Sequence, residues 1–131
     1  MAEPNEKSIF VRTPRNYFVD FTNATGTAKS ALVTGGPNSG SRVDSIHVVS
    51  DDTVARSLAV YLTKGDVDHF WGRVLITALA GIDGKPWIEA LDTLNGGNSL
   101  FLEQGVSVTV GMFVAVANEK TVSVTALAGD F

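Results

Sequence analysis

The sequence predicts an all-β fold, because apolar and polar residues alternate along most of the chain and a period of two is the mark of a strand with one buried face. The alternating segments are rich in β-branched and aromatic residues, which strands favour. Clusters of Gly, Pro, Asn and Asp separate these segments, as turns between strands require. Seven or eight strands at this spacing predict one antiparallel β-sandwich or barrel with jelly-roll-like connections.

The C-terminal third of the chain shows the clearest alternation. Val106, Val108, Val110, Met112, Val114 and Val116 share one face of the predicted strand. At about 3.3 Å per residue a strand over 106–117 would be unusually long, so we expect a bend or bulge at Gly111. The alternation restarts at 121–127, and the two segments are predicted to pair as a hairpin.

Five further segments are predicted to be strands, namely 17–22, 28–34, 43–49, 57–63 and 70–79. A helix competes with one of them, because Val54, Leu58 and Leu62 recur every four residues. The β-branched and aromatic content of this segment favours the strand. A short helix is expected near 86–95, which begins with Pro and ends before Gly-Gly.

The first fifteen residues differ from the rest of the chain, since they are polar, lack a pattern and contain Pro4 and Pro14. We expect an extended N-terminal arm over 1–15 and one sandwich or barrel domain over 16–131. The apolar residues Ile9 and Phe10 interrupt this polar arm. They are therefore expected to pack on the domain or on a neighbouring subunit.

Composition argues against several classes of function. The net charge is −4 and the ten Lys and Arg residues are scattered, whereas a nucleic-acid surface needs clustered cations. The absence of cysteine excludes disulfides and thiolate metal sites. The N-terminus lacks the pattern of a signal peptide, and the longest apolar run, 110–117, is far shorter than the ~20 residues that span a bilayer. Neither nucleic acid nor a membrane is expected as a partner.

The sequence contains no clear constellation for catalysis or metal binding. His47 shares a strand face with Val49, which is typical of a packed or surface histidine. His69 follows Asp66 and Asp68, but this cluster lacks the ligands of a zinc site and the spacing of a calcium loop. A solvated acidic turn is the favoured interpretation. We therefore expect no enzyme activity, no cofactor and no metal.

Aromatic residues leave a binding function open. Trp71 and Trp87, together with Tyr61, have rings that can stack on a sugar. The alternative function is thus a carbohydrate-binding module or a tail-associated adhesin. Two tryptophans in a sandwich are more often part of a core or an interface.

Four short motifs carry a resemblance to a known group of proteins. They are Gly40-Ser41-Arg42-Val43, the segment 50–56 with the sequence SDDTVAR, Gly81-Ile82-Asp83-Gly84 and the ending Ala128-Gly129-Asp130-Phe131. On these motifs, the chain from Gly40 onward resembles small virion proteins of tailed bacteriophages. Those proteins are encoded near the major capsid protein and are described as head decoration (cement) or minor structural proteins.

The resemblance implies a non-enzymatic virion structural protein that stabilises a phage head. Its partners would be the outer surface of the major capsid protein lattice and other copies of itself, in a homo-oligomer that is often a trimer. It would be made in the host cytoplasm without a signal peptide and located on the head surface of the virion. We expect capsid or subunit contacts at the two ends of the chain, at Ile9, Phe10, Arg12, Arg15, Asp130 and Phe131.

Overall fold

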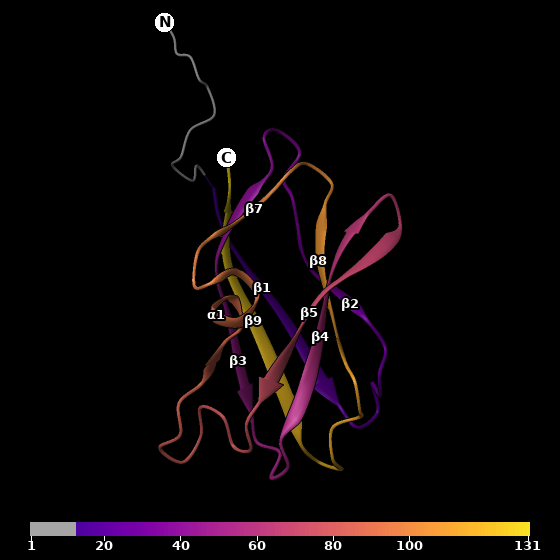
Figure 1. Ribbon diagram of the computed structural model, residues 1–131, viewed down its shortest axis with the longest axis vertical. Coiled ribbons are helices and arrows are strands. Elements are labelled where there is room, and N and C mark those ends of the chain that lie inside the picture. The colour runs from indigo at the N-terminus through magenta and orange to yellow at the C-terminus, as the bar shows by residue number, and fades with distance from the viewer. Residues whose placement is uncertain (1–12) are drawn as a thin grey trace, which may run out of the picture.

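The computed structural model describes residues 13–131 and contains two antiparallel sheets that pack face to face (Figure 1). Sheet A has the order β1 (Thr13–Thr22), β9 (Thr121–Asp130), β3 (Ser41–Ser50) and β6 (Ile88–Glu89), and β7 (Leu100–Leu102) pairs with the other half of β3. Sheet B has the order β2 (Ser30–Thr34), β8 (Ser107–Met112), β4 (Arg56–Lys64) and β5 (Val67–Ile76). The helix α1 (Ala90–Asn95) lies between β6 and β7 in the chain.

The connections between the strands are those of a jelly roll. The chain alternates between the sheets from β1 to β4 and forms the β4–β5 hairpin within sheet B. It returns to sheet A for both β6 and β7, enters sheet B with β8 and ends in sheet A with β9. As a result, each sheet mixes strands from both halves of the chain. The predicted all-β sandwich with jelly-roll-like connections is confirmed, and the barrel alternative is not adopted.

The predicted hairpin between 106–117 and 121–127 is wrong. β8 pairs with β2 and β4 in sheet B, whereas β9 pairs with β1 and β3 in sheet A. Both strands bury one face in the same core, so alternation predicts them equally well in either sheet. The expected bulge at Gly111 is also absent, because Gly111 pairs with Ala59 in an unbroken register and the strand simply ends at Met112.

The other predicted elements are found with shifted ends. The segment 57–63 lies in β4 and is a strand, whereas 77–79 belongs to a turn after β5. The expected helix near 86–95 is confined to α1, where the Glu89 carboxylate accepts a hydrogen bond from the Leu91 N–H and Gly96 ends the helix with φ 62°. Residues 13–15 of the expected arm form the start of the edge strand β1, where Pro14 is tolerated.

The core lies between the sheets and consists mainly of branched aliphatic side chains. Val43, Ile46 and Val48 of β3 face Leu58 and Val60 of β4, and all five are fully buried. Burial of each such side chain contributes roughly 1.5–3 kcal/mol. The alternation seen in the sequence therefore places the apolar residues of both sheets in one continuous core.

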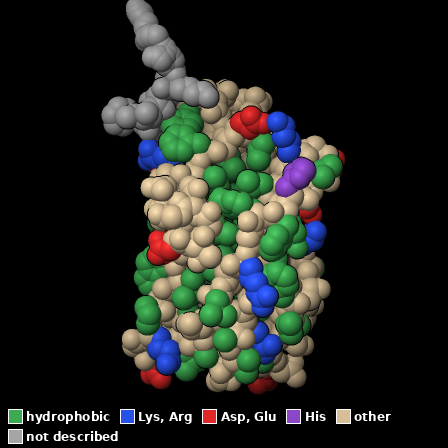
Figure 2. Space-filling view, viewed as in Figure 1, with side chains coloured by type: hydrophobic (Ala, Val, Ile, Leu, Met, Phe, Trp, Pro, Cys, Tyr) green, Lys and Arg blue, Asp and Glu red, His purple; other side chains and the backbone are tan. Residues whose placement is uncertain are grey.

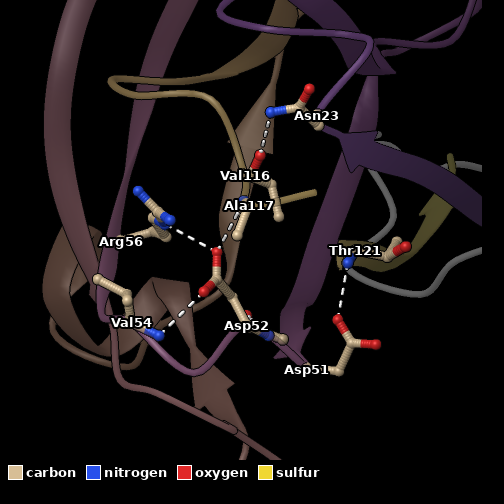
Figure 3. Close-up of polar contacts among 9 residues, drawn as sticks. Asn23, Asp51, Asp52, Val54, Arg56, Val116, Ala117 and Thr121 are labelled. Carbon is tan, nitrogen blue, oxygen red and sulfur yellow. Dashed lines mark hydrogen bonds and ion pairs between the residues drawn. The ribbon is translucent and has the colours of Figure 1, made fainter. Parts of the chain in front are cut away.

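A buried carboxylate ties together one end of the sandwich (Figure 3). Asp52 has no exposed surface and accepts hydrogen bonds from Val54 N (2.9 Å), Ala117 N (3.0 Å) and Arg56 Nε (2.8 Å). Beside it, the Asp51 carboxylate accepts a hydrogen bond from Thr121 N at 2.7 Å. The β3–β4 loop is thus joined to the segment that crosses from β8 to β9.

The hydrogen bonds around Asp52 outweigh the cost of its burial. Burial by itself raises the pKa of Asp52, but the donors from Ala117, Arg56 and Val54 hold the charged form and lower the pKa below its usual value. The ionised carboxylate therefore stabilises the fold. This contribution to stability is complete at pH values above ~3.9, the pKa of the carboxyl in the unfolded chain. It is lost as the pH falls through the lower pKa that Asp52 has in the folded protein.

Asp52→Asn is expected to lower the free energy of unfolding at neutral pH by about 3 kcal/mol, because it leaves the largely buried Arg56 guanidinium without its counter-charge. Urea unfolding at neutral pH, with Asp66→Asn in an exposed turn as the control, measures this difference. In strong acid the difference from wild type is expected to shrink. A difference that persists unchanged at low pH would contradict the role of the charge.

Candidate functional site

The end of the sandwich opposite Asp52 brings together the first and last described residues of the chain. The register of β1 and β9 places Thr13 opposite Asp130, and the register of β3 and β9 places Ser41 opposite Asp130 on its other side. Figure 1 shows the C-terminus at this end, close to β7. We call the side chains that meet here the terminal cluster: Arg15, Ser41, Phe101, Asp130 and Phe131.

The Asp130 carboxylate lies at the centre of the terminal cluster. Arg15 Nε forms an ion pair with Asp130 Oδ2 at 3.0 Å, and Ser41 Oγ donates to Asp130 Oδ1 at 2.6 Å. Gly36 N in turn donates to Ser41 Oγ at 2.9 Å. The Asp130 side chain is only 13% exposed, so it holds the cluster together rather than offering a free charge to solvent.

Glycines make the close approach of the 35–40 loop possible. A Cβ atom on Gly36 would lie 2.7 Å from Asp130 Cγ, which is closer than real Cβ contacts. Gly40 adopts φ 82°, and a Cβ there would overlap the carbonyl oxygen of Leu102. The glycine-rich segment 35–40 is one of the turns between strands that clusters of Gly, Pro, Asn and Asp predict. Its glycines allow the backbone to lie directly against Asp130.

Two aromatic rings cover the outer side of the terminal cluster. Phe131 stacks on Phe101 with ring centroids 5.8 Å apart and an interplanar angle of 20°. The backbone N–H of Phe131 donates to Gly40 O at 3.2 Å, which holds the last residue in place. Phe101 is 60% exposed. The pair thus presents a fixed apolar surface beside the Arg15–Asp130 ion pair.

Three of the six residues expected at an interface come together in this cluster: Arg15, Asp130 and Phe131. Ile9, Phe10 and Arg12 lie outside the described residues. Sequence reasoning missed Ser41 and Phe101, which are distant in the chain from the residues that they contact. The one local signal for Phe101 is its outward position in the short alternating run Leu100–Leu102.

Charged residues of the terminal cluster affect the pKa of the nearby Tyr17 phenol. Its pKa is raised above its ordinary value by partial burial first, and then by the negative charge of Asp130, while Arg15 acts in the opposite direction. The phenol therefore stays protonated well above neutral pH.

The sequence-based metal candidate is not assembled as a metal site. Asp68 Oδ2 pairs with Lys29 Nζ at 2.9 Å, and its other oxygen accepts from Thr63 Oγ1 at 2.7 Å. The hydrogen bond from Lys29, followed by that from Thr63, lowers the pKa of Asp68. Within residues 13–131, no group of three or more His, Cys, Asp or Glu residues is placed to hold a metal ion.

The aromatic residues considered for sugar binding already have partners within the chain. Trp71 packs partly buried against the core. Trp87 is 45% exposed but stacks on the His47 ring, with centroids 4.0 Å apart. His47 is thus held by packing against an indole ring, which agrees with the favoured interpretation of this residue.

The outer face of sheet B carries a row of aromatic and basic side chains. The rings of Tyr61 and Phe70 lie 5.6 Å apart and those of Phe70 and Phe113 lie 6.3 Å apart, both edge to face. Lys29 Nζ lies 4.4 Å from the Tyr61 ring and Arg73 Cζ lies 4.9 Å from the Phe113 ring. Figure 2 shows basic and hydrophobic side chains side by side on the surface of the molecule.

The part of the chain that the structure describes contains no helix of the length and hydropathy needed to cross a membrane. Comparison of the sequence with protein-family models and with curated proteins finds no match.

Asp130→Asn is expected to lower the pKa of Tyr17 towards its ordinary value of 10.0, because it removes a negative charge that opposes ionisation of the phenol. The ultraviolet absorbance of the phenolate, followed against pH in a Tyr61→Phe background, isolates Tyr17. The control is Asp20→Asn, which removes an exposed charge from the opposite face of β1. An unchanged Tyr17 titration in Asp130→Asn would contradict the described cluster.

Proposed function

We propose that this chain is a non-enzymatic virion structural protein that decorates and stabilises the head of a tailed bacteriophage. As a homo-oligomer, a trimer, it binds the outer surface of the major capsid protein lattice. The resemblance of four short motifs to such proteins suggests this function. The position of two of these motifs in the structure supports it.

The observation that carries the proposal is the meeting of two resembling motifs in the terminal cluster. Ser41 belongs to the motif at 40–43, Asp130 and Phe131 belong to the motif at 128–131, and Ser41 donates directly to Asp130. A third motif, at 50–56, contains the buried Asp52. Residues from three of the four resembling motifs therefore lie at the two ends of the sandwich.

The terminal cluster has the properties of an attachment surface. Phe101 and Phe131 offer rings held in place by stacking, which lose little conformational freedom on binding, and such aromatic anchors dominate many interfaces. Residue 12 is joined to Thr13 at the same end. The proposed contacts at Ile9, Phe10 and Arg12 thus continue from the cluster along the chain.

Binding at many equivalent sites on the capsid lattice adds up to the proposed stabilisation of the phage head. A ligand that binds only the expanded lattice stabilises that state by mass action. A trimer that bridges neighbouring capsid subunits gains occupancy by avidity without new contacts. A modest affinity at each terminal cluster is therefore sufficient.

The alternative, a carbohydrate-binding module or tail-associated adhesin, has weaker support. It depends on rings that are free to stack on a sugar, and Trp71 and Trp87 each already pack against other groups of the chain. Binding of the wild-type protein to a glycan array, lost in Trp87→Ala, would favour this alternative over capsid decoration.

The proposal predicts that the purified protein sediments with expanded, emptied heads of the phage that encodes it, prepared without this protein. Phe131→Ala is expected to weaken the binding at least about tenfold, because it removes one of the two stacked anchors. Removal of residues 1–12 is expected to weaken it further. Binding is measured by co-sedimentation over a range of protein concentrations.

The matched control for Phe131→Ala is Leu75→Ala, which removes an apolar side chain that is 60% exposed on sheet B, away from the terminal cluster. It is expected to bind like wild type. If the wild-type protein stays in the supernatant at all concentrations, the decoration function is wrong. Equal losses in Phe131→Ala and Leu75→Ala would place the attachment surface elsewhere.

A further inference from the structure

The turn that follows α1 places Asn95 directly before Gly96, and no other asparagine of the sequence precedes a glycine. Asparagine is one of the thermally labile residues of proteins. Because glycine has no side chain, its backbone nitrogen can approach a neighbouring group closely. Asn95 is half-buried, and the Gly96 and Gly97 residues that follow it are exposed. Water therefore reaches this pair of residues in the folded protein.

Asn95 and Gly96 carry the two groups that react in spontaneous deamidation. The backbone nitrogen of Gly96 attacks Cγ of Asn95, so that the N–Cγ bond forms and the Cγ–Nδ2 bond breaks. Nδ2 leaves as ammonia and takes up the proton of the Gly96 amide. Water then opens the cyclic imide at either carbonyl, which gives aspartate or isoaspartate at position 95. The net reaction consumes water and releases ammonia, with no oxidant or reductant.

The folded turn engages both reacting groups in other contacts. Asn95 Nδ2 donates to Asn98 O at 3.2 Å and to Ser99 O at 3.1 Å. Gly96 adopts φ 62° and ψ 26°, and its N–H donates to Leu91 O inside α1. Asn98 Nδ2 donates back to Asn95 O at 3.2 Å. The amide of Asn95 and the nitrogen of Gly96 are thus held in separate hydrogen bonds, so the reaction requires the turn to open.

The product of the reaction cannot make the contacts that Asn95 makes. A carboxylate at position 95 has no proton to donate, so it would face the carbonyl oxygens of Asn98 and Ser99. Its charge would stand at the C-terminal end of α1, where the helix dipole disfavours an anion. Isoaspartate also adds a methylene to the backbone. Ser99 leads directly into β7, which pairs with β3 and carries Phe101. Loss of the turn would therefore loosen β7.

We infer that Asn95 is a site of spontaneous deamidation, and that the turn over 95–99 controls the rate of the reaction and transmits its effect to β7. The modification goes beyond the proposed function and does not depend on it, because neither the reaction nor its structural effect involves a capsid. Its structural effect reaches the terminal cluster, since Phe101 of β7 stacks on Phe131.

The first test compares deamidation in the folded full chain and in the same chain unfolded in urea, at mildly alkaline pH. Peptide mapping by mass spectrometry detects the mass increase that replacement of NH₂ by OH brings. Asn95 is expected to be the first asparagine to react in the folded protein, at least about tenfold more slowly than in the unfolded chain. Equal rates in the two states would overturn the inference, as would an Asn95 that stays intact in the folded protein through prolonged incubation.

Asn98→Ala tests whether the turn controls the rate, because it removes the hydrogen bond to Asn95 O and leaves the reacting pair unchanged. Deamidation of the folded variant is expected to be at least about threefold faster than in wild type, as for the loss of one hydrogen bond. The matched control is Asn118→Ala in the exposed turn before β9, which is expected to react like wild type. A rate in Asn98→Ala equal to that of the control would overturn the role of the turn.

Asn95→Asp tests the effect on β7, because it introduces the carboxylate without waiting for the reaction. Hydrogen exchange of the β7 backbone amides is expected to be about tenfold faster than in wild type. Asn118→Asp makes the same change of charge in the turn before β9 and is expected to leave β7 unchanged. Circular dichroism establishes that both variants are folded. Exchange in β7 that is the same in both variants would overturn the transmitted effect.

Discussion

The antiparallel pairing of β9 with both β1 and β3 is the interaction on which the rest of the structure depends. β9 is the last strand of the sequence, yet it lies inside sheet A and pairs along its length on both sides. Sheet A is therefore completed only when the C-terminal segment has joined it. The same strand contributes Val124 to the core, Leu127 to the outer face and Asp130 to the terminal cluster. Its register thus positions the core and the terminal cluster at once.

A carboxylate closes each end of the sandwich, but its donors differ between the two ends. At one end, the backbone N–H groups of Val54 and Ala117 lie outside the strand ladders and find an acceptor in Asp52. Asp52 is fully buried and joins two loops through backbone donors and Arg56. Asp130 is reached by side chains, and its partner Arg15 is half exposed. The Asp52 end is thus enclosed within the fold, whereas the Asp130 end presents an ion pair and two aromatic rings at the surface. This contrast supports the proposal that the protein attaches to the capsid through the end of the sandwich that carries the terminal cluster.

The outer faces of both sheets expose apolar side chains beside polar and charged ones. Sheet A exposes Phe18 and Leu127 beside Asp20, and sheet B exposes aromatic rings beside Lys29 and Arg73. In the proposed function, the terminal cluster meets the capsid lattice, and avidity over many such contacts raises occupancy.

The local sequence pattern was sufficient to predict most of the strands and part of the terminal cluster. Alternation and β-branched residues predicted the seven longer strands, which are β1 to β5, β8 and β9, whereas the short strands β6 and β7 were not predicted. The turns rich in Gly, Pro, Asn and Asp were predicted from their composition, and the segment 35–40 is one of them. Arg15, Asp130 and Phe131 were expected at an interface because they lie near the two ends of the chain. Their partners Ser41 and Phe101 carried no comparable signal, since each lies in an ordinary strand far away in the chain. The sequence by itself determined which segments form the longer strands and which of their side chains are buried, because alternation is a local property. Only the tertiary structure decided that β8 and β9 lie in opposite sheets and that Asp130 meets Ser41, because jelly-roll pairing joins distant segments whose local patterns are interchangeable.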